Sequence, residues 1–321
     1  MKKINKVFLT LLFLNSIGNI NAQQKTTNKM ETKKIAYADK ILLHMHPEKF
    51  LNFLPNLNDD QIAQLYGMSI EEYQLTKKVY DDQAKNTASE LLTNSDFTFK
   101  IDKLPFKKNQ TVLVIGESTA DALNSWVYIL QYLLDQRRPQ DNIRIINAAL
   151  SGQTTTEALR KITAQVKLSP DWVICHLGTN DCIRYGNQKT SVSLAETIAN
   201  LITIKEIINK DTKANIVWLT PALIDEKKAE NFQPFKMQQL SLKNLDLNEI
   251  NKYLKAQPEP VIDLTEEFGN PVNPEFVQYD GIHLTIDGQK AIVKSLINKF
   301  TVYQYMISFL ITLHLASAFF Y

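Results

Sequence analysis

The sequence predicts an α/β protein: a three-layer α/β/α sandwich around a five-stranded parallel sheet, preceded by a helical preface. After Pro105, short runs rich in β-branched and apolar residues alternate with longer stretches in which apolar residues recur every three or four positions. Five such runs separated by helices imply parallel strands joined by right-handed crossovers, with helices covering both faces of the sheet.

Each element follows from this alternation. The expected strands are Thr111–Ile115, Ile143–Asn147, Trp172–Leu177, Asn215–Leu219 and Pro260–Leu264. The expected helices are Asp121–Gln136, Thr155–Val166, Ser193–Ile208, Met237–Leu254 and Ile286–Lys299. Ligands of such sheets bind beyond the carboxyl ends of the strands, so the residues just after each run are the candidates for a functional site.

The N-terminus has the pattern of an export signal. Three lysines within the first six residues precede an apolar run over 7–14, and small and polar residues then lead to Ala22. The run is too short to span a bilayer, and no cysteine lies near the expected cleavage point. We therefore expect a signal peptide over 1–22, a disordered polar leader over 23–35 and an exported protein, periplasmic or extracellular.

The sequence pattern predicts that the preface, residues 36–105, is helical. Ser69 and Glu72 form a capping box, which marks the start of a helix. His44 and His46 lie two residues apart and would face different sides of a helix, which makes them a poor metal-binding pair. We expect both histidines to be surface residues.

The hydrophobic tail over 301–321 contains no charged residue and is about as long as a membrane-spanning helix. The sequence leaves three interpretations open: a C-terminal membrane anchor, a segment packed on the domain, and an appended artefact. Between the preface and this tail, residues 106–300 form the expected α/β domain.

Composition limits the function classes. A formal charge of +2 without a basic block argues against nucleic-acid binding, and 44% apolar residues suit a globular protein. The two cysteines, Cys175 and Cys182, cannot form a zinc site alone. Export permits a disulfide between them, and two buried thiols are equally compatible with the sequence. Oligomeric state is not readable from these features.

A hydroxyl, a base and a carboxylate stand at the predicted strand ends. Ser118 follows the first run, and Asp280 and His283 lie on one loop before the last helix. A serine hydroxyl is a poor nucleophile at neutral pH and needs a histidine base, which an acidic side chain orients. The backbone N–H groups of Ser118 and Gly152 and the side-chain amide of Asn180, all at neighbouring strand ends, would donate to the oxyanion of the intermediate.

Four segments in this order resemble the four blocks of the SGNH (GDSL-type) esterase and lipase family over residues 110–299. They are Gly116-Glu117-Ser118, Ser151-Gly152-Gln153, Gly178-Thr179-Asn180-Asp181 and the Asp280-x-x-His283 pair. The resemblance implies a flavodoxin-like fold with Ser118 as nucleophile, Asp280 and His283 completing the triad, and Ser118, Gly152 and Asn180 as the oxyanion hole.

The resemblance also implies no metal and no cofactor. Glu117 replaces the aspartate usual in the first block, which puts the local turn geometry in question more than the chemistry. The α/β-hydrolase alternative fits less well, because position 120 is alanine where its nucleophile motif needs glycine.

The function expected is hydrolysis of a carboxylic ester through an acyl-enzyme intermediate, removing an acyl or acetyl group from a carbohydrate, lipid or small ester. Two alternatives stay open: an acyltransferase acting on a cell-envelope glycan or lipid, and a non-catalytic carbohydrate- or partner-binding protein of the same fold. Segment Asp225–Phe235 is expected to wall the pocket, with Phe232 and Phe235 lining it; surface coverage is an equal alternative.

Three other polar residues near the strand ends receive structural roles. We expect His176 to be a buried strand residue and Asp181 to support its loop through hydrogen bonds. Asp263 ends the fifth run but has no histidine at close spacing, which argues against its being the triad acid.

Overall fold

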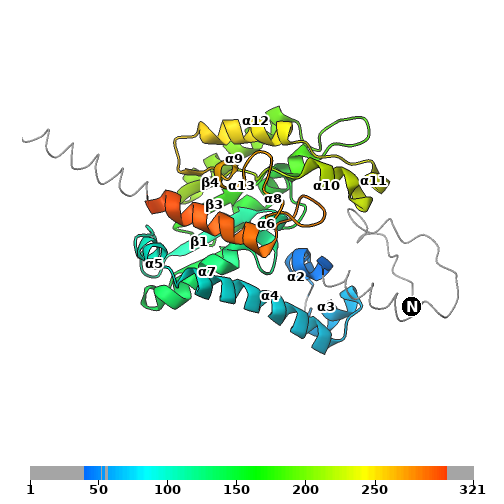
Figure 1. Cartoon of the computed structure of the whole chain (residues 1–321). Coiled ribbons are helices and arrows are strands. Elements are labelled where there is room, and N and C mark those ends of the chain that lie inside the picture. Colours follow the sequence, from blue (N-terminus) through cyan, green and yellow to red (C-terminus); the bar gives the residue numbers. More distant parts are fainter. Residues whose placement is uncertain (1–39, 52, 55–56, 302–321) are drawn as a thin grey trace, which may run out of the picture.

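The computed structural model describes residues 40–301, apart from 52 and 55–56 (Figure 1). The expected signal peptide and leader, and all of the hydrophobic tail except Thr301, lie outside the described residues. Within the described ranges, no helix is both long and apolar enough to cross a membrane.

Five parallel strands form the central sheet in the order β2-β1-β3-β4-β5. Their bounds are β1 Thr111–Gly116, β2 Arg144–Asn147, β3 Trp172–His176, β4 Asn215–Leu219 and β5 Val261–Ile262. Val112 of β1 pairs with Ile145 on one side and Trp172 on the other. This order is the flavodoxin-like one, whose ligand crevice opens between β1 and β3, so the predicted fold is confirmed.

Helices cover both faces of the sheet (Figure 1). On one side α7 Trp126–Arg137 packs against α4 Ile70–Leu91. A helix over 286–301 contacts both of them. The N–H of Trp126 donates to the side-chain oxygen of Gln289, and Lys290 forms an ion pair with Glu90. On the other side α9 contacts α8 and α12. These three helices are α8 Thr155–Val166, α9 Leu194–Asp211 and α12 Asn244–Lys255.

Two helix starts differ from the prediction. The helix expected from Asp121 is divided into α6 Ser118–Asp121 and α7, because Ala122 leaves helical geometry with a ψ of 139°. The helix expected from Met237 begins at Asn244, after α10 Glu226–Asn231 and α11 Gln233–Gln238. Gln239 ends α11 in a left-handed conformation. The remaining short helices are α2 Pro47–Phe50, α3 Asp59–Tyr66, α5 Ser95–Asp102 and α13 Thr265–Phe268.

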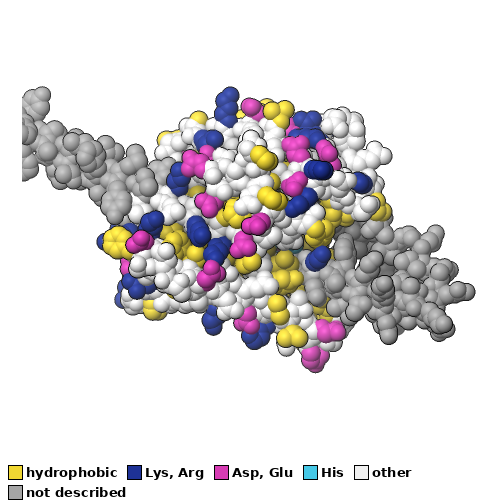
Figure 2. All heavy atoms as spheres, in the orientation of Figure 1, with side chains coloured by type: hydrophobic (Ala, Val, Ile, Leu, Met, Phe, Trp, Pro, Cys, Tyr) yellow, Lys and Arg dark blue, Asp and Glu magenta, His cyan; other side chains and the backbone are white. Residues whose placement is uncertain are grey.

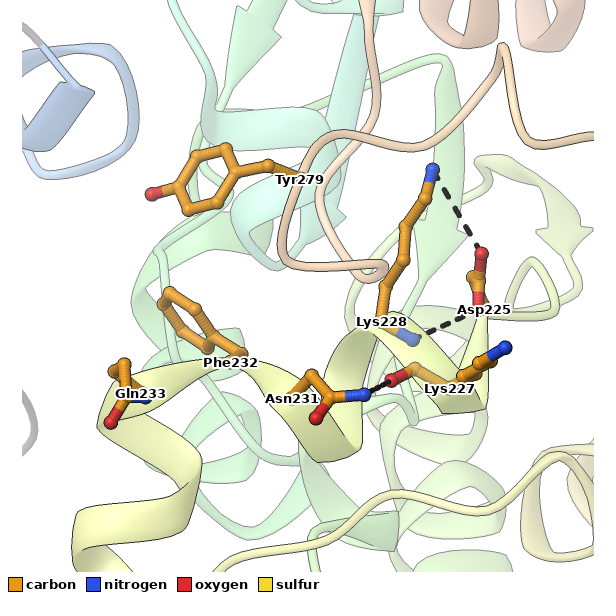
Figure 3. A pocket seen from close by; sticks show the side chains of 7 residues that line it. All are labelled: Asp225, Lys227, Lys228, Asn231, Phe232, Gln233 and Tyr279. Atoms are coloured by element: carbon orange, nitrogen blue, oxygen red, sulfur yellow. Dashed lines mark hydrogen bonds and ion pairs between the residues drawn. The ribbon is translucent and has the colours of Figure 1, made fainter.

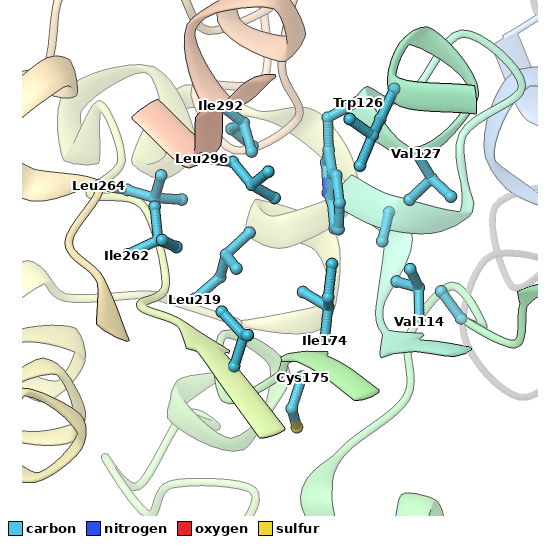
Figure 4. Packing of buried hydrophobic residues seen from close by; sticks show 14 of the residues in the cluster. Val114, Trp126, Val127, Ile174, Cys175, Leu219, Ile262, Leu264, Ile292 and Leu296 are labelled. Carbon is cyan, nitrogen blue, oxygen red and sulfur yellow. The ribbon is translucent and has the colours of Figure 1, made fainter. Parts of the chain in front are cut away.

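The later part of the preface shares a core with the sheet, whereas its first part, from Leu42 to Tyr73, packs in a separate small cluster. The capping box of Ser69 and Glu72 is present at the start of α4, as predicted. Ala84 and Ala88 of that helix are fully buried in the same apolar cluster as the strands. At the centre of this cluster, Figure 4 shows strand residues such as Ile174 beneath Trp126 and Leu296.

Both cysteines are buried free thiols, so of the two alternatives, a disulfide and two buried thiols, the structure has the second.

On the face shown in Figure 2, lysines and arginines are interspersed with aspartates and glutamates.

Candidate functional site

Ser118 is the first residue of α6, directly after β1, and its side chain is partly buried. Side chains from neighbouring elements fix the turn that carries it. Asn147 Nδ2 donates to the carbonyl of Ala120 at 2.7 Å, and Gln289 Nε2 donates to the carbonyl of Thr119 at 3.0 Å. The strand end, β2 and the last helix therefore hold the turn of Ser118 together.

Asp280 and His283 are joined as the spacing predicted. His283 Nδ1 lies 2.7 Å from Asp280 Oδ2, and the other carboxylate oxygen accepts the N–H groups of Ile282 and His283, each at 2.9 Å. Because an ionised carboxylate only accepts hydrogen bonds, Nδ1 carries the proton. Nε2 is then the unprotonated nitrogen, available as a base.

The two groups stabilise each other's charged forms. Burial alone would raise the pKa of Asp280, but the charge and hydrogen bond of His283, with two backbone N–H groups, lower it to about 2. For His283, burial lowers the pKa, and the charge and hydrogen bond of Asp280 outweigh this and raise it above its usual value. The pair thus holds an ionised acid beside a strengthened base.

Gly281 allows the loop between these two residues to pack closely on α10. Its φ is +74°, and a Cβ atom added there would lie 2.4 Å from the carbonyl oxygen of Asp225. The N–H of Asp225 donates to the carbonyl of Gly281 at 2.9 Å. A side chain at this position would therefore displace the acid–base pair.

The third predicted triad member is not hydrogen-bonded to the other two. In the part of the chain that the structure describes, no hydrogen bond joins the Ser118 hydroxyl to the His283 ring. Hydrogen bonds between catalytic groups are often long in ligand-free enzymes and tighten when substrate binds.

Two of the three predicted oxyanion donors are unpaired. Gly152 adopts a φ of +78° in the turn after β2, a conformation that suits glycine. Among the described residues, neither the Ser118 N–H nor the Gly152 N–H has a backbone acceptor. Both can donate to a ligand.

Asn180 is already engaged. Its Nδ2 donates to Glu117 Oε2 at 2.9 Å and to the carbonyl of Gln153 at 3.1 Å, and its backbone N–H donates to the same glutamate oxygen at 3.3 Å. Asn180 can serve an oxyanion by releasing or sharing one of the two side-chain bonds.

Glu117 thus has a role that the sequence did not reveal. Its backbone is extended, so the departure from the family motif is accommodated in the turn, and the side chain is buried. Burial raises the pKa of Glu117 to about 7, although hydrogen bonds from Thr179 and Asn180 oppose the rise. The carboxyl connects the first block to the third and orients the amide of Asn180.

The expectation that His44 and His46 are surface residues is wrong. His46 is 2% exposed, and its Nδ1 lies 2.9 Å from the carboxylate of Asp121 on α6, the helix that begins at Ser118. The His44 ring packs on that of His283, with centroids 4.2 Å apart, and both of its ring nitrogens are buried without a partner. Helical spacing alone could not show that the preface folds back over the catalytic residues.

A cavity of about 560 Å³ adjoins the acid–base loop (Figure 3). It is lined by Asp225, Lys227, Lys228, Asn231, Phe232, Gln233 and Tyr279. Tyr279 directly precedes Asp280, and its ring packs edge-on against that of Phe232, with the ring centroids 5.8 Å apart. Segment Asp225–Phe235 therefore does wall a pocket; Phe232 lines it, while Phe235 is buried behind Phe232.

The three structural assignments are confirmed. His176 is buried in β3, and burial lowers its pKa to about 4. Asp181 accepts from the N–H of Thr155 and the hydroxyl of Thr197, each at 2.9 Å. Asp263 accepts a hydrogen bond from the Thr265 hydroxyl and forms an ion pair with Lys255, and no histidine of the described chain bonds to it.

Comparison with known proteins adds to this geometry. The model of the GDSL-like lipase/acylhydrolase family matches residues 114–291, more than half of the chain. A curated relative is thioesterase 1/protease 1/lysophospholipase L1 of Escherichia coli K12. It is 25% identical over 191 residues, which cover 56% of this chain and 77% of that protein.

No group of three or more side chains suited to a metal occurs in the described ranges.

Solved structures with similar folds include the crystal structure of TesA, at 22% identity and a TM-score of 0.45, covering 59% of this chain and 97% of that one. A lipase/acylhydrolase from Enterococcus faecalis has 22% identity and a TM-score of 0.47, covering 60% and 96%. A variant of Axe2, an acetyl xylan esterase from Geobacillus stearothermophilus, has 18% identity and a TM-score of 0.48, covering 62% and 96%.

Proposed function

Because the chain belongs to the GDSL-like lipase/acylhydrolase family, a family of ester-hydrolysing enzymes, we propose that it cleaves a carboxylic ester through an acyl-enzyme intermediate on Ser118. The observation that carries this proposal is the hydrogen-bonded pair of a buried Asp280 and a partly exposed His283 on a loop beyond β5 and α13, at the same edge of the sheet as Ser118. A strengthened histidine base at that edge is what a serine hydroxyl needs to attack a carbonyl.

In the acylation step, Ser118 Oγ attacks the carbonyl carbon and its proton passes to His283 Nε2. The resulting imidazolium is stabilised by Asp280, whose low pKa keeps it ionised throughout. The tetrahedral oxyanion accepts hydrogen bonds from the backbone N–H groups of Ser118 and Gly152. When the intermediate collapses, the carbon–oxygen bond to the alcohol breaks and His283 returns the proton to the leaving oxygen.

In the second step, His283 takes a proton from a water molecule, and the hydroxide attacks the acyl-enzyme. The same donors stabilise the second oxyanion. Collapse breaks the bond to Ser118 Oγ, which recovers its proton from His283 and releases the acid. Loss of one oxyanion donor typically raises such a barrier by about 3 kcal/mol.

For the substrate, we propose an acyl or acetyl ester of a carbohydrate, a lipid or a small alcohol. The aromatic pair of Phe232 and Tyr279 beside the triad loop offers an apolar surface, and Lys227 and Asn231 add polar groups to the same cavity. The E. coli relative, by its name, acts on thioesters and lysophospholipids.

We also propose that the enzyme acts outside the cytoplasm. The lysine-rich start and apolar run over 7–14 support export, and the uncharged segment over 301–321 supports membrane attachment. Cell fractionation of the full-length chain, with N-terminal sequencing of the mature form, would test both.

Replacement of Ser118 by alanine tests the catalytic proposal. Hydrolysis of a short-chain nitrophenyl ester should fall at least a thousandfold, because the nucleophile is gone. A fluorophosphonate probe should label the wild type and not the variant, while circular dichroism stays the same. Undiminished hydrolysis would refute the assignment, and transfer of the acyl group to an added sugar in place of release as free acid would favour an acyltransferase.

A further inference from the structure

A segment of the preface lies directly against the catalytic residues. The N–H of Leu123 donates to the carbonyl of Leu43 at 3.0 Å, which ties the segment to the turn after α6. The hydroxyl of Ser151 donates to the carbonyl of His44. These contacts place residues 43–49 beside two parts of the site: the helix that begins at Ser118 and the loop that contains Gly152.

Asp121 is the centre of these contacts. It lies three residues after Ser118 on α6, and its side chain is fully buried. One carboxylate oxygen accepts the backbone N–H of Ser151 at 2.8 Å. The other accepts from His46 Nδ1 at 2.9 Å and from Lys49 Nζ.

Lys49 forms a second bond to the same loop. Its ammonium group also donates to the carbonyl of Ala149 at 3.0 Å. The loop 149–151 is therefore held by a carboxylate on the nucleophile's helix and by an ammonium group of the preface. Gly152, whose N–H is a predicted oxyanion donor, is the next residue.

Such a cluster fixes geometry because a buried charge tolerates little displacement. A carboxylate without partners in the protein interior is strongly destabilising, so its hydrogen bonds are kept at good geometry. Burial alone would raise the pKa of Asp121, but the hydrogen bonds and charges of His46 and Lys49 lower it, which keeps the carboxylate ionised. The ionised group then holds the Ser151 peptide at a fixed distance from α6.

We propose that Asp121, together with His46 and Lys49, positions the loop that donates the Gly152 N–H to the oxyanion. The inference rests on the proposed esterase function. Asp121 is a positioning residue and does not touch the reacting atoms. The preface thereby supplies two side chains on which the geometry of the active site depends, although it lies outside the matched family region.

Three variants test this role. Asp121→Asn keeps the size of the side chain and removes its charge, Lys49→Met removes the ammonium group, and Lys49→Arg restores a cation. Asp102→Asn is the matched control, because Asp102 of α5 also forms an ion pair between the preface and the catalytic part, with Arg137 of α7, away from the site. Each variant is assayed for kcat and KM, for affinity toward a boronic acid that forms a tetrahedral adduct on Ser118, and for melting temperature.

We expect kcat to fall about ten- to a hundredfold in Asp121→Asn and Lys49→Met, because a displacement of about 1 Å in a catalytic group has effects of this size. Boronate affinity should fall by a similar factor, with KM within about threefold of the wild type. Lys49→Arg should recover most of the loss, and Asp102→Asn should behave like the wild type.

Two results would overturn the inference. One is unchanged kcat and boronate affinity in Asp121→Asn. The other is a loss that matches the fraction of unfolded enzyme, since a structural role alone predicts it. If the wild type itself neither hydrolyses the ester nor binds the boronate, the proposed function fails and this inference fails with it, whereas an active wild type with an unaffected Asp121→Asn refutes the positioning role alone.

Discussion

At the scale of single residues, the behaviour of the site depends on how each buried acid is compensated. Asp280 is held ionised by His283 and two N–H groups, whereas Glu117 is buried beside Asn180 and Thr179 and forms no ion pair within the described ranges. Their pKa values accordingly move in opposite directions, to about 2 and about 7. Two carboxyl groups of the same site therefore differ in protonation at neutral pH: Asp280 is ionised, and Glu117 is partly protonated.

Asp280→Asn should lower kcat by about four orders of magnitude, because an amide disfavours the required histidine tautomer and cannot stabilise the imidazolium. Asp280 raises the pKa of His283, so its loss should lower that pKa. The acid limb of kcat/KM, where activity rises with pH as His283 loses its proton, should then shift to lower pH.

A profile from pH 4.5 to 9 measures this shift. Asp263→Asn is the control, since that carboxylate stands at another strand end and binds Thr265. An unshifted acid limb in Asp280→Asn would contradict the assigned pair.

Glu117 should make the fold less stable as pH rises. With a folded pKa of about 7 against an ordinary 4.5, its contribution is complete below pH 4.5 and is lost as pH increases to about 7. Glu117→Gln removes this dependence. Relative to the wild type, its free energy of unfolding should therefore rise between pH 4.5 and 8 by an amount on the order of 3 kcal/mol.

Urea unfolding at several pH values tests this. Glu71→Gln, at an exposed position of α4, should show no such change. A parallel pH dependence in wild type and Glu117→Gln would mean that Glu117 is ionised in the folded protein.

At the scale of elements, the strand ends were predictable and the preface contacts were not. The β-rich runs fixed where Ser118, Gly152, Asn180 and the Asp280–His283 loop would emerge, because parallel strands end at one edge. Nothing comparable linked His46 to Asp121, which are 75 residues apart and lie in different parts of the fold. That contact depends on how the segment around Leu43 and His44 docks on Leu123 and Ser151, which local periodicity does not encode.

The loop of the acid–base pair depends on Gly281. Gly281→Ala would place a methyl carbon 2.4 Å from the Asp225 carbonyl oxygen at a φ of +74°. We expect kcat to fall about a hundredfold, since the loop must move, and stability to fall by more than the roughly 1–2 kcal/mol of the left-handed backbone.

Gly67→Ala is the matched control for Gly281→Ala. Gly67 has a φ of +71°, and a Cβ added there would meet no atom within 4 Å. This variant should lose stability only through the cost of holding alanine in the left-handed backbone conformation, and it should keep full activity. Equal effects of the two variants would mean that the contact with Asp225 does not position the loop.

At the scale of the whole molecule, α4, α5 and the sheet share one apolar core. α4 buries Ala84, Ala88 and Leu91 in the cluster that contains the strands, and α5 adds Phe97 and Ile101. The sequence indicated a boundary at Pro105 because the periodicity of the pattern changes there. A change of periodicity marks a change of secondary structure, and the core that α4 and α5 share with the strands extends across this boundary.

The shared core predicts a single unfolding transition, which Ala88→Glu tests. Ala88 is a fully buried residue of α4. An unpaired charge at this position should lower the free energy of unfolding by about 3 kcal/mol or more. All three tryptophans, Trp126, Trp172 and Trp218, lie in the catalytic part, so fluorescence follows that part while far-ultraviolet circular dichroism also follows α4. Both signals should shift together to lower temperature, and ester hydrolysis should be lost over the same range.

Asn86→Glu is the control, because it adds the same charge at an exposed position of the same helix, and it should melt like the wild type. Two separated transitions in Ala88→Glu, with helix lost first and hydrolysis retained, would show that the preface unfolds independently. Loss of hydrolysis together with the helix is expected, because the preface also carries His46 and Lys49 to the carboxylate of Asp121.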